Sequence, residues 1–308
     1  MNIGIKSVHT YCPEYFLDNF EQSKKWGVEK DFINNKIGSI KLSRMKECED
    51  TTDIAQYAVE NLFQSNDSLR SKIQCLIVVT QNPDNGGLPH SSAILHKKLE
   101  LEKNCAVFDL SLGCSGYVQG LSIAKAFMES QGFKNGILVT ADPYSKIIDA
   151  NDRDTALLFG DAATATWLGE NPLWSIKNCD FGIVSDKYEA LQVSNSKLVM
   201  KGREVFNFAA FYVPKSIQKV LNDSGLKIED IDMVLLHQGS RFIVETLARR
   251  LGTEGRTPFS SKNYGNTISS SIPMMLAELN LHTSRRILLS GFGVGLSWAT
   301  CILEKIEK

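Results

Sequence analysis

The sequence predicts an α/β fold that is built twice. Apolar runs of strand length alternate with amphipathic stretches of helix length along the chain. Continuous apolar runs such as residues 75–80 are typical of parallel strands that helices cover on both faces. The second half then repeats the order of strands and helices found in the first half. Together these observations favour a duplicated α/β architecture.

The first half contains alternating strand and helix patterns. Residues 18–46 combine short polar helical patterns with a loop at 36–39. Residues 51–53 cap a helix whose apolar positions fall at three- and four-residue spacing and form one buried stripe. The other expected elements are a first strand from residue 3, strand 75–80, loop 81–90, helix 91–101, a strand from 107, helix 118–128, strand 136–140, loop 149–155 and strand 163–168.

The second half follows the same order. A helix with apolar positions from Phe208 to Leu221 precedes strand 232–237, and helix 242–251, helix 269–279, strand 286–290 and strand 296–303 follow. His237 thereby takes the place of Thr80, and Asn266 takes the place of Cys114. The offset between matching positions shortens from 157 at His237 to 152 at Asn266, as loop-length differences between two copies would produce.

Composition excludes several classes of protein. With 308 residues the chain is long enough for two units, and 43% hydrophobic with 22% charged residues is typical of globular proteins. The net charge of -1 gives no electrostatic basis for binding nucleic acid. No stretch approaches the roughly 20 apolar residues of a membrane span, and no signal-peptide pattern precedes the first strand. We expect a cytoplasmic protein that binds neither nucleic acid nor a membrane.

Seven cysteines are present, an odd number without any CxxC pair. This pattern supports neither a disulfide framework nor a zinc site, and it favours a reducing compartment. We therefore expect no metal site.

Cys114 is the strongest candidate for chemistry. It stands where an apolar strand enters a small-residue turn just before a helix, beside unpaired backbone N–H groups and the positive end of the helix dipole. Such a position lowers a thiol pKa and favours the thiolate. Gly113, Ser115 and Gly116 are small enough to leave the approach to the sulfur open. The alternative is a small apolar residue packed between strand and helix.

Duplication brings three polar residues together. If the halves pack against each other, Cys114 and Asn266 face one another, and His237 reaches the same crevice from the carboxyl end of its strand. Taken singly, His237 could instead be a strand-end histidine with its hydrogen bonds satisfied, and Asn266 a helix cap. Their convergence favours an active site.

Five motifs give the sequence a family resemblance over nearly its whole length. It resembles the ketoacyl-acyl-carrier-protein synthase III family of thiolase-fold condensing enzymes. The resemblance implies a thiolase-like fold of two βαβαβαββ halves, residues 1–170 with the nucleophile and residues 171–308 with His and Asn, packed as a five-layer αβαβα sandwich. The motifs are Phe108–Gly116, Asp152–Thr155 with Phe159–Asp161, His237–Gln238, Gly265–Thr267 and Gly291–Gly295.

The resemblance also implies a Cys-His-Asn triad. Cys114 would attack an acyl thioester, and the backbone N–H groups of Cys114 and Val294 would hold the oxyanion. His237 and Asn266 would hold the thioester carbonyl of a malonyl donor while CO2 departs. No cofactor is implied, because coenzyme A thioesters are the substrates. Val294 itself departs from the glycine that is usual in the family.

Binding residues follow from the same resemblance. Leu88 would reach across a homodimer and close the acyl pocket of the partner. Ser240 and Phe242 replace the family's usual asparagine and arginine, so the identity of the donor stays open. Arginines near the site could meet an acidic carrier protein or form a solvated helix face. The implied coenzyme A and substrate contacts are Phe32, Lys36, Arg153, Phe206, Ser240 and Phe292, and the carrier-protein contacts are Gln238, Arg241 and Arg249.

The expected function is that of a β-ketoacyl-ACP synthase III-like acyltransferase. An acyl-CoA primer would load Cys114, and decarboxylative Claisen condensation with malonyl-ACP or malonyl-CoA would give a β-ketoacyl thioester. The altered stretch Ser240–Phe242 keeps open a second possibility, acyl transfer to an oxygen or nitrogen nucleophile in a secondary-metabolite or surface-sugar pathway. A catalytically silent partner subunit is a third, against which the intact triad argues. A thiolase would need a second catalytic cysteine near the C-terminal glycine-rich turn, where this sequence has Phe292 and Val294.

Overall fold

A computed structural model describes residues 2–307 of the chain. In its first half, two small strands and two short helices form an excursion between the first strand and the first long helix. The elements are β1 (Ile3–Tyr11), β2 (Phe16–Asp18), α1 (Asn19–Ser23), α2 (Lys30–Phe32), β3 (Lys41–Ser43), α3 (Thr51–Ser65), β4 (Cys75–Val79), α4 (Ser91–Lys98), β5 (Ala106–Leu110), α5 (Gly116–Gln131), β6 (Asn135–Ala141), α6 (Arg153–Ala156) and β7 (Ala163–Glu170).

The second half begins with a long strand and a hairpin. Its longest helix, α7, covers the sheet and precedes the strand that ends at the His237 motif. The elements are β8 (Trp174–Ile183), β9 (Leu191–Ser194), β10 (Lys197–Met200), α7 (Gly202–Ser224), β11 (Met233–Leu236), α8 (Arg241–Leu251), α9 (Ser271–Glu278), β12 (Arg286–Gly293) and β13 (Ser297–Lys305).

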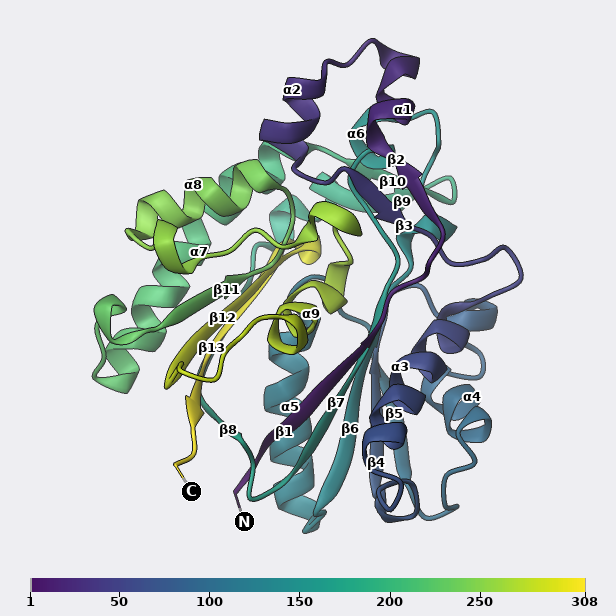
Figure 1. The fold of residues 1–308 in the computed structure, drawn as a ribbon, viewed down its shortest axis with the longest axis vertical. Helices are drawn as coiled ribbons and strands as arrows, with labels where there is room; N and C mark the ends of the chain where they lie inside the picture. The colour runs from purple at the N-terminus through teal and green to yellow at the C-terminus, as the bar shows by residue number, and fades with distance from the viewer. Residues whose placement is uncertain (1, 308) are drawn as a thin grey trace.

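Helices and strands alternate in five layers (Figure 1). Helices α3 and α4 cover the outer face of β1, β7, β6, β4 and β5, and α7, with α8 packed on it, covers the outer face of β8, β13 and β12. Helices α5 and α9 lie between the two groups of strands and contact both. The implied αβαβα arrangement is therefore confirmed. Its middle layer begins at the two candidate site segments, because α5 follows Cys114 and α9 follows Asn266.

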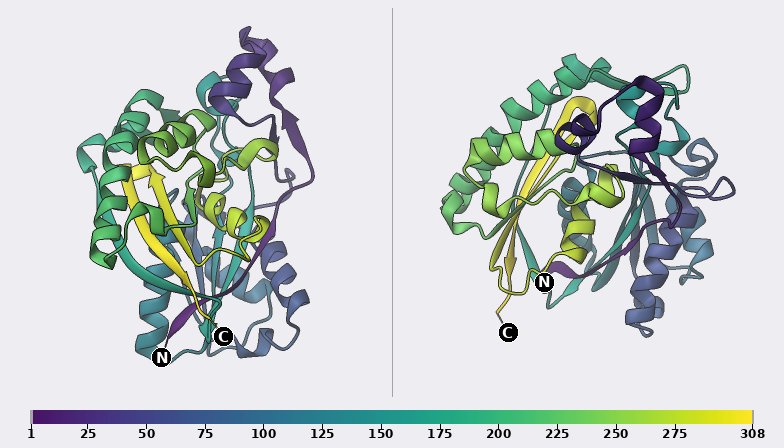
Figure 2. Two further views of the ribbon diagram at one scale, coloured as in Figure 1. Left: turned by 60° about the vertical axis from the view of Figure 1, so that its left-hand side comes forward. Right: turned by 45° about the horizontal axis from the view of Figure 1, so that its top comes forward.

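The two groups of strands join edge to edge in one nine-stranded order, β11-β12-β13-β8-β1-β7-β6-β4-β5. The junction is narrow, because β1 and β8 pair only at Gly4 with Ser175 and at Ile5 with Trp174. Figure 2 shows β1 beginning and β13 ending at the same end of the molecule. We propose that the two halves divide between Glu170, where β7 ends, and Trp174, where β8 begins.

The second half departs from the implied βαβαβαββ order. The first half has that order, but between α8 and α9 the described residues contain no strand to match β5. Pro258 has no backbone N–H to give to a sheet. The side chain of Gln238 takes the place of strand-to-strand hydrogen bonds to this segment. Its Nε2 donates to the Pro258 carbonyl at 3.3 Å, and its Oε1 accepts from the Ser260 N–H at 2.8 Å.

Other sequence expectations were wrong in detail. Residues 36 and 37 end a π-helical turn, Ile33–Ile37, rather than open a loop, and Gly38 follows it with a φ of 88°. Strand β8 had no sequence signal because its pairing register with β13 shifts beside Cys301, which breaks the inside–outside alternation that identifies a strand. Among residues 2–307, no helix is both long and apolar enough to cross a membrane.

Candidate active site

Cys114 lies between β5 and α5, two residues before the helix begins. Its side chain is buried, with 4% exposure. The end of β12 packs directly on it: a Cβ added at Gly293 would lie 2.6 Å from the Cys114 Sγ, and one added at Gly291 would lie 2.5 Å from its carbonyl oxygen. Only glycine fits at these two positions, so β12 and the Cys114 turn form one packed unit.

The predicted lowering of the Cys114 pKa is wrong. Burial raises the pKa of this thiol to about 12, and the nearby Asp142 carboxylate adds to the rise. The backbone N–H groups of Val294 and of Cys114 itself donate toward the sulfur and oppose the shift. Loss of water around the sulfur therefore outweighs the helix terminus. The small neighbours serve packing instead of access, since a Cβ at Gly116 would lie 2.5 Å from Val79.

His237 follows β11 directly, and its N–H donates to the Ser290 carbonyl of β12 at 2.9 Å. The ring Nδ1 lies 2.9 Å from the Ser271 hydroxyl, and the ring of Phe292 packs against the imidazole at 5.6 Å between centroids. Burial lowers the His237 pKa to about 3, while a hydrogen bond to the Ile268 backbone opposes the shift. The imidazole is therefore neutral near pH 7.

Asn266 is fixed through its backbone to the first half of the chain. Its N–H donates to the Leu158 carbonyl, and its carbonyl accepts from the Gly160 N–H, both at 2.9 Å. Its side-chain Oδ1 accepts from the Ile268 N–H at 3.0 Å. The side-chain NH2 has no hydrogen-bond partner among residues 2–307, so it can donate to a substrate.

These contacts connect the three residues. Gly293 touches the sulfur of Cys114, and the adjacent Phe292 packs on the ring of His237. Ile268 contacts His237 through its backbone and the side chain of Asn266 through its N–H. A buried thiol, a neutral imidazole and a carboxamide donor are thus linked through shared neighbours, and they are the groups that nucleophilic acyl chemistry with an oxyanion requires.

We expect Gly293→Ala to abolish loading of Cys114 while the chain remains folded. The new Cβ would stand 2.6 Å from the sulfur and force Cys114 away from the Val294 N–H. Intact-mass spectrometry after incubation with acyl-CoA measures the loss, and thermal unfolding checks the fold. Gly255→Ala is the matched control, since a Cβ there meets nothing within 4 Å. Normal loading of the Gly293 variant would contradict the packing argument.

One pocket, which we call the Phe206 pocket, has wall residues that neighbour His237 and Asn266. It has a volume of about 390 Å³. Gly239 forms part of its wall, and the Nε2 of His237 lies 3.8 Å from the position of a Cβ on that glycine. Leu158, another wall residue, accepts the backbone hydrogen bond of Asn266. The predicted binding residues in its wall are Phe32, Lys36, Arg153, Phe206 and Ser240.

The wall of the Phe206 pocket includes an aromatic stack with a cation on it. Phe206 and Phe242 stack at 5.3 Å between centroids, and the Lys36 ammonium lies 3.9 Å from the centre of the Phe242 ring. Arg153 reaches the pocket from α6 and pairs with Asp154 at 2.7 Å. An aromatic face beside cations suits a nucleotide with phosphate groups.

A second pocket, the Gln81 pocket, lies near Cys114. Its volume is about 330 Å³, and Val294 and Gly295 form part of its wall. The Oε1 of Gln81 and the side chain of Val294 lie 2.5 and 2.7 Å from the position of a Cβ on Gly113, the residue before Cys114. The Gln81 pocket therefore adjoins the turn that carries Cys114.

Several implied contacts do not match the structure. Phe292 is buried against His237 and does not line the Phe206 pocket. Gln238 is fully buried, so it cannot meet a carrier protein. Arg241 is half-buried, lies over the ring of Phe259 and pairs with Glu245 at 3.3 Å. Arg249 is exposed on α8, and Leu88 is 86% exposed, so both remain open to a partner.

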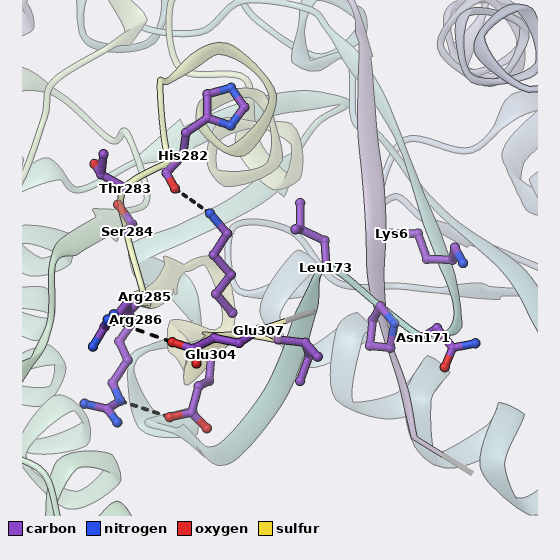
Figure 3. A pocket seen from close by; sticks show the side chains of 13 residues that line it. Lys6, Asn171, Leu173, His282, Thr283, Ser284, Arg285, Arg286, Glu304 and Glu307 are labelled. Atoms are coloured by element: carbon purple, nitrogen blue, oxygen red, sulfur yellow. Dashed lines mark hydrogen bonds and ion pairs between the residues drawn. The ribbon is translucent and has the colours of Figure 1, made fainter.

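A larger hollow lies elsewhere, between Lys6 of β1, the turn that joins β7 and β8, and the end of β13 (Figure 3). Its volume is about 970 Å³, and none of the predicted site residues lines it. Its charged side chains already have partners: Arg286 pairs with Glu304 at 3.0 Å, Arg285 pairs with Glu307 at 3.9 Å, and Lys305 donates to the His282 carbonyl. Size alone therefore does not identify the site.

Sequence reasoning missed Asp142, which follows β6 directly at the carboxyl edge of the sheet. Its Oδ1 accepts from the Gln81 N–H at 3.1 Å and from the Asn82 side chain at 3.0 Å. Its buried Oδ2 has no hydrogen-bond partner within residues 2–307. Burial raises the Asp142 pKa to about 7. A polar residue at the end of an apolar strand was the signal that could have revealed it.

We expect Asp142→Asn to stabilise the fold at pH 8 by up to about 4 kcal/mol. The pKa rises from 3.8 unfolded to about 7 folded, so the folded carboxyl holds a proton that the unfolded one has released. The contribution of this protonated carboxyl to the free energy of unfolding is complete below pH 3.8 and is lost as the pH rises to 7. Urea unfolding at pH 5 and pH 8 measures the difference. Asp67→Asn, at an exposed site, is the control, and equal pH dependence of the Asp142 variant and wild type would contradict the expectation.

Family comparisons agree with this geometry. Residues 108–185 match the profile of 3-Oxoacyl-[acyl-carrier-protein (ACP)] synthase III, and residues 221–305 match that of its C-terminal region. The chain is 32% identical over 323 residues to Beta-ketoacyl-[acyl-carrier-protein] synthase III of Clostridium acetobutylicum, covering 98% of each. The chain belongs to the 3-oxoacyl-ACP synthase III family.

Solved structures of synthase III proteins show the same thiolase-like α/β fold. A 3-oxoacyl-(acyl-carrier protein) synthase from Burkholderia xenovorans is 29% identical with a TM-score of 0.92, covering 99% of this chain and 94% of that one. A priming beta-ketosynthase from a polyketide biosynthetic pathway is 25% identical with a TM-score of 0.89, covering 99% and 96%. One of the structures similar to this chain is therefore named for a polyketide pathway.

Proposed function

We propose that this synthase III family member joins an acyl primer to a malonyl thioester. In the first half-reaction the sulfur of Cys114 attacks the carbonyl of an acyl-CoA, and its proton leaves with the coenzyme A thiol. The tetrahedral oxyanion accepts hydrogen bonds from the N–H groups of Cys114 and Val294, which already point toward the sulfur. The products are an acyl-enzyme and free coenzyme A.

In the second half-reaction a malonyl thioester enters through the Phe206 pocket. Its thioester carbonyl accepts hydrogen bonds from His237 and from the NH2 group of Asn266. CO2 leaves, and the resulting enolate carbon attacks the acyl carbonyl on Cys114. The new carbon–carbon bond releases the Cys114 thiolate and gives a β-ketoacyl thioester. Neutral donors suit this step, because they stabilise the enolate without neutralising it by full proton transfer.

The observation that carries the proposal is the position of the Phe206 pocket. Its wall combines an aromatic and cationic surface with Gly239, which neighbours His237. Phe32, Lys36 and Arg153 would bind the nucleotide and phosphates of coenzyme A. Exposed Arg249 would meet an acidic carrier protein, and exposed Leu88 would reach a second subunit.

Two assays on the same sample test this function. Intact-mass spectrometry with a panel of acyl-CoAs should show one acyl group per chain, and malonyl-ACP or malonyl-CoA should then release CO2 and form a β-ketoacyl thioester. Absence of acylation with every member of the panel would reject the proposal.

A second function, transfer of the acyl group to an oxygen or nitrogen nucleophile, is favoured by one observation. Phe242 lies in the wall of the Phe206 pocket at a position where the family usually has arginine, and it stacks on Phe206 beneath Lys36. The pocket wall therefore offers less positive charge to a malonyl carrier. Acylation of Cys114 without CO2 release would favour this second function over condensation.

A further inference from the structure

The Gln81 pocket is placed to receive the acyl group on Cys114. Val294 lines it, and the N–H of Val294 donates toward the sulfur of Cys114. The side chain of Gln81 also lines it and packs against Gly113. An acyl chain on Cys114 that enters this pocket would therefore contact Gln81 and Val294.

The lining of this pocket combines polar and apolar side chains. The polar ones are Gln81, Asn82, Ser111 and Gln192, and the apolar and aromatic ones are Tyr144, Ile147, Tyr188, Leu191, Val193, Leu198 and Val294. A volume of about 330 Å³ limits the occupant to a small group. An unbranched alkyl chain would match the apolar side chains alone.

Two of the polar side chains, Gln81 and Asn82, are held in place by hydrogen bonds to buried groups. The Tyr144 hydroxyl, itself buried, donates to the Oε1 of Gln81 at 3.3 Å. The carboxyl of Asp142, which is 1% exposed, accepts from the Gln81 backbone and from the Asn82 side chain. These bonds leave the Gln81 NH2 group and the Asn82 Oδ1 without hydrogen-bond partners among residues 2–307. A plain alkyl group would cover both groups and leave them unsatisfied, which is unfavourable.

We propose that the Gln81 pocket selects a short acyl group with a hydroxyl or similar hydrogen-bonding substituent, and that Gln81 recognises the substituent. The inference rests on the proposed function, because it specifies the primer that loads Cys114. A hydroxyl both donates and accepts, so it can accept from the Gln81 NH2 and donate to the Asn82 Oδ1. Sites built to bind a substrate hydroxyl discriminate strongly against the analogue that lacks it.

Competition between two probes of equal chain length tests the inference. The full-length protein is mixed with equal concentrations of 3-hydroxybutyryl-CoA and butyryl-CoA, and intact-mass spectrometry reports the ratio of the two acyl-enzymes at early times. We expect the hydroxyacyl group to load at least about tenfold faster. The ratio does not depend on the fraction of active protein, so a partly unfolded variant remains informative.

We expect Gln81→Leu to reduce that ratio to about one or below, because the substituent loses its donor. Gln131→Leu, at an exposed position at the far end of α5, should keep the wild-type ratio. Equal loading of both probes by wild type, or preference for butyryl, would overturn the inference and leave the proposed function intact. An unchanged ratio in Gln81→Leu would overturn the role of Gln81. Failure of both probes and of every other acyl-CoA would overturn the inference together with the function.

Discussion

Cys114→Ala is expected to eliminate the acyl-enzyme and to lower condensation by roughly 10⁴-fold or more. Alanine has the same backbone and removes only the sulfur, which two backbone N–H groups and Gly293 surround. Among residues 2–307 no other cysteine lines the Phe206 or the Gln81 pocket. The acyl mass should therefore disappear from the intact protein, and a peptide map of wild type should place it on Cys114.

Two further substitutions make the Cys114 experiment specific. Cys48→Ala removes an exposed thiol, and Cys105→Ala removes a buried one that packs behind β4. Both variants should acquire the acyl group as wild type does. Persistent acylation of Cys114→Ala at an equal rate would mean that another residue is the nucleophile, and the assigned half-reactions would then be wrong.

Periodicity predicted the fold well where one face of an element is buried. The spacing of apolar positions in α3 identifies its buried stripe, and the continuous apolar run of β4 identifies a strand covered on both faces. Long-range pairing decides the elements that were missed. Strand β8 takes its register from β13, a partner more than a hundred residues away, and its bulge hides the alternation.

In the candidate site, too, local features were predicted and long-range contacts were missed. Short motifs identified Cys114, His237 and Asn266, because their residue types and local turns are visible in the sequence. The direction of the Cys114 pKa shift was predicted wrongly, because the burial that raises this pKa depends on β12 packing over the sulfur. Ser271 and Asp142 were missed for a related reason. Each acts through a hydrogen bond to a residue distant in sequence, and no local pattern records that bond.

The other large effect is expected from Asn266→Asp, which should slow condensation about 10²- to 10³-fold while Cys114 is still acylated. Aspartate keeps an oxygen that can accept the Ile268 N–H, so the local turn is retained. It replaces the NH2 donor with a second oxygen, which removes a hydrogen bond to the enolate and can add a negative charge beside it. Separate measurement of acyl-enzyme formation and of CO2 release distinguishes the two half-reactions.

The neighbouring Asn263→Asp makes the same chemical change at an exposed position three residues away, and it should leave both half-reactions unchanged. His237→Ala should resemble Asn266→Asp, because both donors serve the same carbonyl. If either site variant released CO2 at the wild-type rate, the enolate would not depend on these donors. If instead Asn266→Asp lost acylation and CO2 release equally, Asn266 would act in loading Cys114. Selective loss of decarboxylation is therefore the result that assigns His237 and Asn266 to the second half-reaction.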